Sequence, residues 1–331
     1  MTNRSARLDN IKGLMILLVV FGHVLELLPP QSWTGVYVAI YLVHMPVFVF
    51  VSGYLTSLRR TPGELVRELV LLYGVAQVAW CGFLWLGTAI ADLPPPTWAQ
   101  MLGLVPSQAL WFIFSLFIWR LLAPALAEVK RPLLWLLFLC GFAAMAGRTP
   151  LDLTLSASRT VAFWPFFAAG LWSRLHHWPL TTAPRTRVDP FLLAGGCALL
   201  AGLTWWCQRM HPGLAHFAFP HEVYQVPWKW GVAFRLGAFL GAVAIIRALF
   251  VWMSEQDSLL TAMGRNSLAI FLGHFYVIQA YRLLEPNGIA PGNFWLIPVL
   301  TLAGCALGWS PIAFWFEQGR AYLATRLFVT K

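Results

Sequence analysis

The chain has 331 residues, of which 59% are hydrophobic and only 11% are charged, and its mean hydropathy is +0.68. An ordinary soluble domain is roughly 25% charged, so the composition excludes a soluble globular protein and indicates an integral membrane protein. The formal net charge of +10 does not indicate a nucleic-acid partner, because the basic residues lie in short segments between apolar runs, where they act as topology signals.

Apolar runs long enough to cross a bilayer recur along the chain, and they predict an all-α, polytopic transmembrane helical bundle of about ten spans. Prolines punctuate the connecting segments, as helix breakers should. The sequence shows no internal repeat and no appended soluble domain, so residues 1–331 are expected to form one transmembrane domain. The expected spans are 11–28, 34–56, 69–91, 101–127, 132–147, 159–175, 191–207, 229–252, 263–284 and 294–316.

The distribution of lysine and arginine predicts the orientation. With a cytoplasmic N-terminus, 16 of the 23 basic residues fall in inner segments and five in outer segments. Cytoplasmic loops carry an excess of Lys and Arg, so both termini are expected to be cytoplasmic.

Cysteine and histidine spacings do not predict a metal site. The five cysteines lie in or at the ends of apolar runs without a C-x-x-C pair, so we expect buried, reduced thiols. The outer loop, about 208–228, contains histidines five residues apart, which suits no usual zinc pattern. This loop is interpreted as one that covers or contacts a substrate. The cysteines are Cys81, Cys140, Cys197, Cys207 and Cys305, and the loop histidines are His211, His216 and His221.

The first apolar run contains two ionisable side chains, His23 and Glu26. Along a helix His23 lies about 16 Å beyond Lys12, which is near the midplane of a hydrocarbon core about 30 Å thick. An ionisable group at that depth is costly and indicates function. Because Glu26 shares a helix face with His23, its carboxylate can fix the imidazole tautomer. His23 is therefore the candidate general base.

Two further histidines lie at a similar depth, His44 in the second span and His274 in the ninth. A single membrane histidine is more often an interhelical hydrogen-bonding group than a catalyst, but three at one depth favour a shared site. Arg159 begins the sixth span from outside, either as part of that site or as an arginine reaching the interface. Depth alone does not establish that these side chains meet.

Basic residues near the inner ends of the spans form a candidate cytoplasmic mouth. Such a cluster suits a phosphorylated ligand and equally suits anionic lipid head groups. Its members are Lys12, Arg59, Arg60 and Arg120.

Five short motifs follow one another along the chain. They are Asp9-Asn10-Ile11-Lys12-Gly13 with Gly22-His23, His44-Met45-Pro46-Val47-Phe48 with Ser52-Gly53-Tyr54, Leu110-Trp111-Phe112, Arg159 with Phe163-Trp164-Pro165-Phe166-Phe167 and Gly170, and Gly264-Arg265-Asn266-Ser267-Leu268 with His274. In this order they resemble the integral-membrane acyltransferase-3 family, which includes bacterial sugar and polysaccharide O-acetyltransferases. The resemblance covers nearly the whole chain and is greatest to the fucose 4-O-acetylase-like branch.

The resemblance implies transfer of an acyl group, usually acetyl, from acyl-CoA to a hydroxyl of a sugar, polysaccharide or lipid-linked glycan. It implies a multi-pass protein of the cell membrane, in bacteria the inner membrane. His23 takes the place of the family's histidine and Lys12 that of its basic partner. The expected catalytic residues are His23, Glu26, Arg159, His274 and His44, and the expected acyl-CoA site comprises Lys12, Arg59, Arg60, Arg120, Asn266 and Ser267.

Several alternatives stay open at this level. Midplane ionisable residues also fit a transporter of a polar solute, and a third hypothesis is a glycan flippase or a structural membrane subunit. For an enzyme, transfer is either direct or through an acyl-histidine. The identity of the acyl group, acetyl or succinyl, the identity of the acceptor and a homo-oligomeric state are not predicted by the sequence.

Overall fold

The computed structural model describes residues 5–28, 34–91, 94–146, 154–209, 226–285, 288–290 and 292–307, and the regular elements in these ranges are helices. Short π- and 3₁₀-helical turns cover Val66–Val70, Gln108–Leu110 and Thr154–Ser156. The α-helices are α1 (Ala6–Leu25), α2 (Thr34–Tyr41), α3 (His44–Tyr54), α4 (Pro62–Leu65), α5 (Leu71–Ala91), α6 (Trp98–Met101), α7 (Trp111–Ala127), α8 (Pro132–Ala146), α9 (Ala157–Leu175), α10 (Pro179–Thr182), α11 (Asp189–Arg209), α12 (Trp228–Trp252), α13 (Leu259–Arg265), α14 (Ser267–Leu284) and α15 (Leu296–Ala306).

The helical bundle expected from the composition is confirmed. Within the described ranges, seven helical segments are long and apolar enough to cross a membrane. The apolar helices α8 and α15 are shorter, and α9 has 19 residues. The count of ten spans and the cytoplasmic placement of the termini stay predictions, and the end of the tenth expected span lies outside the described residues.

The second expected span, 34–56, is not one continuous helix. α2 ends at Tyr41, and α3 begins at His44. Pro46 explains the break, because its missing N–H is tolerated in the first turn of α3 whereas its ring clashes with the carbonyl of Leu42 in a continuous helix. The ninth expected span, 263–284, is likewise divided at Asn266 between α13 and α14.

The fourth expected span, 101–127, also begins later than expected, because α7 starts only at Trp111. The preceding segment folds back onto α5, where Gln77 holds it. The Gln77 amide donates to the Gln100 carbonyl (2.8 Å) and the Ser107 hydroxyl (2.9 Å), and its oxygen accepts from the Ser107 N–H (2.9 Å). One buried polar side chain thus satisfies backbone and side-chain groups that would otherwise be buried without partners.

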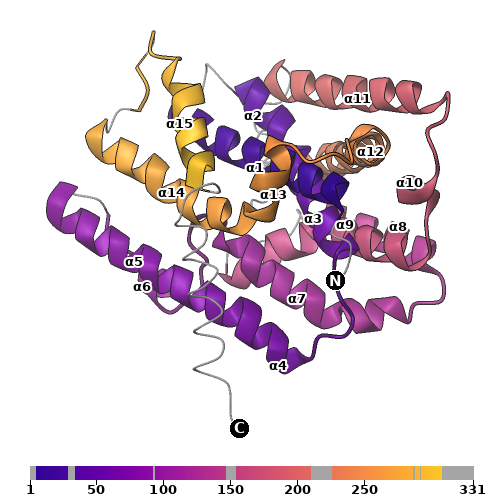
Figure 1. Ribbon diagram of the computed structural model, residues 1–331, viewed down its shortest axis with the longest axis horizontal. Coiled ribbons are helices and arrows are strands. Elements are labelled where there is room, and N and C mark those ends of the chain that lie inside the picture. Colours follow the sequence, from indigo (N-terminus) through magenta and orange to yellow (C-terminus); the bar gives the residue numbers. More distant parts are fainter. Residues whose placement is uncertain are drawn as a thin grey trace.

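Helix α1 lies in the middle of the bundle, in contact with α3, α13, α14 and α15 (Figure 1). Glycines allow its backbone to touch that of α13. A Cβ atom on Gly13 would lie 1.9 Å from the backbone carbonyl oxygen of Leu260, and a Cβ atom on Gly264 would lie 1.8 Å from the backbone carbonyl oxygen of Asp9. Small residues that permit such close approach are typical of membrane helix interfaces.

A second pair of glycines joins α3 to α9. A Cβ atom on Gly53 would lie 2.1 Å from the Phe167 carbonyl oxygen, and one on Gly170 would lie 2.0 Å from that of Phe50. The motif glycines therefore allow close backbone contact at both crossings, α1 with α13 and α3 with α9.

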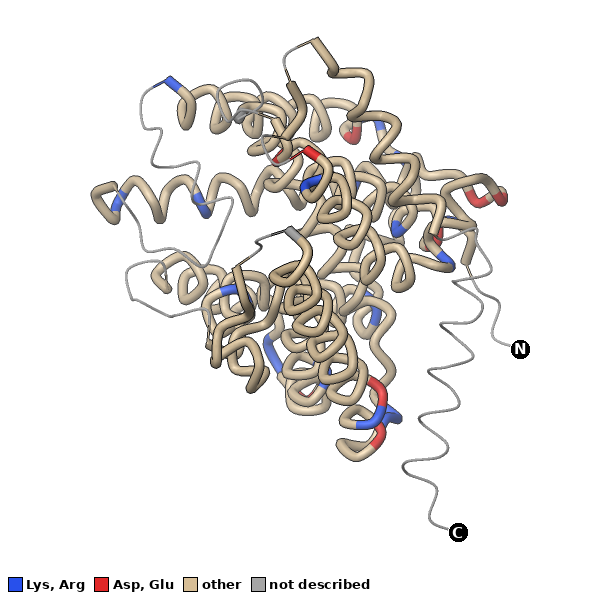
Figure 2. The backbone as a smooth tube through the Cα atoms, turned by 90° about the vertical axis from the view of Figure 1, so that its left-hand side faces the viewer, with Lys and Arg blue, Asp and Glu red and all other residues tan. Residues whose placement is uncertain are grey.

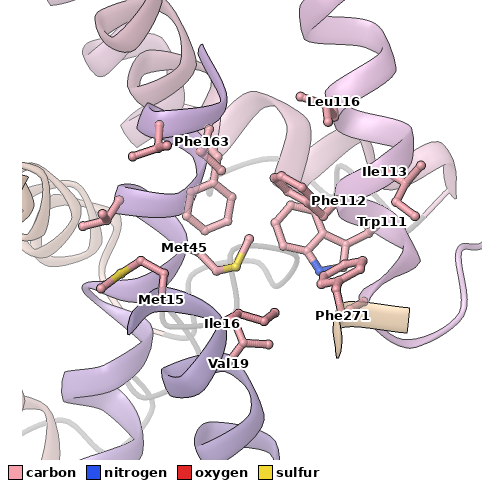
Figure 3. Packing of buried hydrophobic residues seen from close by; sticks show 14 of the residues in the cluster. Met15, Ile16, Val19, Met45, Trp111, Phe112, Ile113, Leu116, Phe163 and Phe271 are labelled. Carbon is pink, nitrogen blue, oxygen red and sulfur yellow. The ribbon is translucent and has the colours of Figure 1, made fainter. Parts of the chain in front are cut away.

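The core between α1, α3, α7, α9 and α14 is packed with large apolar side chains. Figure 3 shows Met15 and Ile16 of α1 facing Phe163 of α9 and Phe112 of α7. The indole N–H of the buried Trp119 also has a partner, because it donates to the Thr160 carbonyl (3.0 Å). This packing fixes the helices that carry the ionisable residues.

Charged residues are sparse over most of the chain, with a compact group of basic and acidic residues at one end (Figure 2). One buried ion pair joins the first residue of α11 to α12. Arg247 contacts both carboxylate oxygens of Asp189, at 2.8 and 3.1 Å, and donates to the carbonyls of Pro179 and Ala183. A bidentate guanidinium of this kind fixes geometry as well as charge.

Candidate active site

The candidate base lies near the end of α1. His23 Nδ1 is 3.1 Å from Glu26 Oε1, and the side chains are 18% and 29% exposed, respectively. A carboxylate can only accept a hydrogen bond, so Nδ1 carries the proton and Nε2 carries the lone pair. This is the arrangement that a general base requires.

Two tyrosines of α2 complete the surroundings of Glu26, and neither was singled out from the sequence. The hydroxyl of Tyr37 donates to Glu26 Oε1 at 2.9 Å, and that of Tyr41 at 3.1 Å. The Tyr41 hydroxyl is also 3.1 Å from His23 Nδ1. Their spacing of four residues, which places both on one face of α2, was the available signal.

The structure brings the three midplane histidines together. The rings of His23 and His274 stack with centroids 5.4 Å apart, and Phe275 lies against both. The His44 ring meets that of Tyr41 edge-on at 4.6 Å. Three helices, α1, α3 and α14, thus contribute to one site.

Hydrogen bonds distinguish the roles open to the histidines. His44 and His274 are both buried, and each directs Nδ1 at the carbonyl four residues earlier, that of Ile40 (2.8 Å) or Ile270 (2.9 Å). Since a carbonyl only accepts, each neutral ring has its lone pair on Nε2. Neither ring, in this neutral form, offers a second N–H to a developing oxyanion.

Arg159 of α9 lies at the edge of the same site. Its guanidinium is 5.2 Å from the centre of the Trp111 ring, a cation–π distance. It also lies within electrostatic range of Glu26, Tyr37 and Tyr41. Arg159 thus lies beside the His23–Glu26 pair, and its catalytic role stays a prediction.

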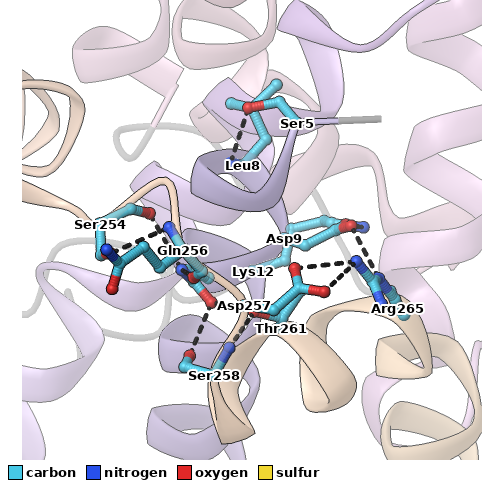
Figure 4. A network of polar contacts seen from close by, with 11 residues as sticks. Ser5, Leu8, Asp9, Lys12, Ser254, Gln256, Asp257, Ser258, Thr261 and Arg265 are labelled. Carbon is cyan, nitrogen blue, oxygen red and sulfur yellow. Dashed lines mark hydrogen bonds and ion pairs between the residues drawn. The ribbon is translucent and has the colours of Figure 1, made fainter. Parts of the chain in front are cut away.

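The expected cytoplasmic cations fall into two groups. In the first, Lys12 Nζ is 2.8 Å from Asp9 Oδ1, while Arg265 Nε is 3.6 Å from Asp9 Oδ2 and Arg265 also pairs with Asp257 (Figure 4). Asn10 anchors this network, because its amide donates to the carbonyls of Ser254 and Gln256. Arg265 was not among the site residues expected from the sequence.

In the second group, Arg60 pairs with Glu68 at 2.7 Å and with Glu64 at 3.8 Å. Arg120 lies in electrostatic range of Glu68 and Arg60. Arg59, which directly precedes Arg60 in the sequence, is exposed. Each group thus contains its own carboxylates. Asn266 and Ser267 lie at the junction of α13 and α14, next to Arg265.

An apolar cavity of about 390 Å³ lies between α5, α14 and the segment before α7. Phe275 lines it and separates it from His23. A smaller cavity is lined by Tyr41, Phe163 and Arg235.

The cysteines are all free thiols, as expected. The expectation of burial is wrong for Cys197, which is exposed on α11. The loop histidines His211, His216 and His221 lie outside the described residues.

Comparison with known proteins identifies the family. A family model described as an acyltransferase domain, that of the acyltransferase-3 family, matches residues 5–313. The Nodulation protein NolL of Mesorhizobium japonicum is 28% identical over 179 residues, 51% of this chain and 47% of that protein. The protein of the same name from Sinorhizobium fredii is 29% identical over 342 residues, 97% of this chain and 91% of that protein.

The chain thus spans about half the length of the first relative and most of the second. No solved structure matches the chain. The family model covers nearly all of the residues that form the bundle and the site. The chain therefore belongs to the acyltransferase-3 family and is a multi-pass membrane acyltransferase.

Proposed function

We propose that the protein transfers an acyl group, acetyl in the first instance, from acyl-CoA to a hydroxyl of a sugar, polysaccharide or lipid-linked glycan at the bacterial inner membrane. The observation that carries this proposal is the His23–Glu26 pair, in which Nδ1 is 3.1 Å from the carboxylate and the ring keeps 18% exposure. A partly exposed imidazole with an oriented lone pair is suited to accept a proton from a hydroxyl.

The proposed reaction needs one base and one oxyanion donor. His23 Nε2 takes the hydroxyl proton as the acceptor oxygen bonds to the thioester carbonyl carbon. The tetrahedral oxyanion then collapses with cleavage of the carbon–sulfur bond, and protonated His23 returns the proton to the CoA thiolate. A base of this kind contributes typically about 10²–10⁴-fold to the rate.

Arg159 is the proposed oxyanion donor. An arginine side chain stays protonated in proteins, so its guanidinium always carries N–H groups that can donate hydrogen bonds. The Nδ1 protons of His44 and His274 are already donated to backbone carbonyls. This difference supports Arg159 over the two histidines, an order that the sequence did not supply.

The donor phosphates are proposed to contact Lys12 and Arg265 near the cytoplasmic end of α1. These cations share the buried carboxylate of Asp9, so the cluster keeps its geometry when no ligand is bound. Lys12 is also on the same helix as His23. Arg59, Arg60 and Arg120 form a second candidate contact for the same phosphates, and Asn266 and Ser267 lie beside Arg265.

Family membership supports an enzyme over the transporter and flippase hypotheses. The observable difference is that an acyltransferase releases free CoA, whereas a carrier moves solute without consuming a thioester.

The test measures the melting temperature of the purified protein in detergent against acetyl-CoA, succinyl-CoA and CoA, together with release of free thiol. A ligand at 100 times its dissociation constant stabilises the folded state by about 2.7 kcal/mol. We expect a rise in melting temperature with one acyl-CoA, weakened in Lys12→Ala and Arg265→Ala. If folded protein shows neither a shift nor thiol release with any CoA species, the proposal is wrong.

The matched control is Arg187→Ala, which removes an exposed arginine before α11. A loss of the shift in Lys12→Ala and Arg265→Ala, with Arg187→Ala unchanged, assigns the phosphates to the cluster around Asp9. An equal loss in all three variants would point to non-specific attraction by the basic protein.

A further inference from the structure

Tyr41 occupies a position that the reaction described above does not yet use. Its hydroxyl is 3.1 Å from both His23 Nδ1 and Glu26 Oε1. Tyr37 reaches the same carboxylate oxygen at 2.9 Å. Tyr41 therefore contacts both His23 and Glu26, whereas Tyr37 contacts Glu26 and Tyr41.

A count of protons defines what Tyr41 does there. The Glu26 carboxylate accepts, so the Tyr41 O–H donates to it, and the lone pairs of the Tyr41 oxygen are left for the His23 Nδ1–H. The Nδ1 proton is then shared between the Glu26 and Tyr41 oxygens. Both contacts favour the proton on Nδ1, and both leave the lone pair on Nε2.

The surroundings of Tyr41 hold its ring in place. It stacks on Tyr37 with centroids 4.0 Å apart and meets His44 edge-on at 4.6 Å. On the α1 side, a Cβ atom on Gly22 would lie only 3.1 Å from Tyr41 Cε2. The glycine next to His23 therefore leaves the space that the Tyr41 ring fills, and the break after α2 directs this ring at the base.

We propose that Tyr41 is a positioning residue that acts through His23, holding the imidazole in the tautomer with the proton on Nδ1 and the lone pair on Nε2. The catalytic part of this inference rests on the proposed function. The tautomer itself is a property of the free protein and is measured without turnover.

The experiment compares Tyr41→Phe with Tyr73→Phe. Both changes remove a phenol hydroxyl that donates a hydrogen bond. Tyr73, on α5, donates to the Gly103 carbonyl, outside the site. Tautomers are read from ¹⁵N shifts of histidine-labelled protein, with the His23 signal identified by its loss in His23→Gln. Steady-state kcat and KM are measured on the same preparations.

In wild type and Tyr73→Phe we expect a single neutral His23 signal with the proton on Nδ1. In Tyr41→Phe only Glu26 still accepts the Nδ1 proton. We therefore expect the Nδ1–H tautomer to lose part of its population to the Nε2–H tautomer, and kcat to fall by up to about tenfold, the effect of one hydrogen bond to a charged network. KM for acyl-CoA is expected to stay within about twofold, because donor contacts are untouched. Gly22→Ala, which displaces the Tyr41 ring, is expected to change the tautomer signal in the same direction.

An unchanged tautomer in Tyr41→Phe overturns the inference, whatever happens to the rate. A mixed tautomer with unchanged kcat also overturns it, because the tautomer would then not limit the reaction. If Tyr41→Phe changes the tautomer but wild type turns over no acyl-CoA, the proposed function fails while the role of Tyr41 in fixing the tautomer stands.

Discussion

At the scale of single residues, hydrogen bonds separate side chains that look alike in the sequence. His23, His44 and His274 share a depth, but His23 Nδ1 meets a carboxylate, whereas the other two meet backbone carbonyls. The ring of His23 alone is paired with a residue that stabilises an imidazolium. Under the proposed function, the same comparison favours Arg159 as the donor to an oxyanion.

Replacement of Arg159 tests this order. We expect Arg159→Gln to lower kcat by about 100-fold, the usual cost of removing one oxyanion donor. Arg159→Lys should retain part of the rate, because charge remains but the forked geometry is lost. The measurement is acyl-CoA turnover with a saturating acceptor.

His44→Gln and His274→Gln are the companion variants. Their effect on kcat is expected to be smaller than that of Arg159→Gln, because their Nδ1 protons are committed to the backbone. A larger loss in either histidine variant, in protein with a normal melting temperature, would assign the oxyanion to that histidine.

At the scale of elements, the glycine crossings decide how close the catalytic helices lie. Where α1 crosses α13, backbone meets backbone, so no flexible side chain can move to admit a methyl group. Overpacking of this kind typically costs about 1–3 kcal/mol. Close helix packing thus explains why glycine occupies these motif positions, independently of any catalytic role.

We expect Gly13→Ala and Gly264→Ala to lower the melting temperature and to weaken activity by moving α1 away from α13. The matched controls are Gly82→Ala and Gly141→Ala, which meet no atom within 4 Å. In these controls the added methyl group is expected to leave stability unchanged or slightly raised. Equal losses in all four variants would contradict the proposed role of the crossing.

At the scale of the whole molecule, the sequence predicted the class of fold and most helix positions, because hydropathy follows directly from composition. It missed the break at Leu42, where apolar residues continue on both sides, and the break at Asn266, although Arg265, Asn266 and Ser267 are polar. It identified His23 and Glu26 by their spacing on one helix. Tyr37 and Tyr41 were missed because their importance comes from contacts between α2 and α1. Their spacing of four residues marks a shared helix face but does not say which residues that face meets.

The buried ion pair between Arg247 and Asp189 is expected to contribute to the stability of the whole bundle. Arg247→Met leaves the Asp189 carboxylate and the carbonyls of Pro179, Leu180, Ala183 and Pro184 without their guanidinium partner, and breaking a buried pair on one side is strongly destabilising. Thermal unfolding should therefore begin well below that of Asp257→Asn, which removes an exposed partner of Arg265. Similar melting temperatures for the two variants would argue against this role.

Helix α1 runs unbroken from Ala6 to Leu25 and carries both Lys12 and His23. Eleven residues of straight helix separate the two side chains by about 16 Å, and the bundle packed around α1 keeps that separation fixed. Under the proposed function, α1 therefore sets the length that an acyl donor must have. A thioester whose phosphate lies closer to its sulfur than this length cannot contact Lys12 and His23 at the same time, so the enzyme would select its donor by length as well as by charge.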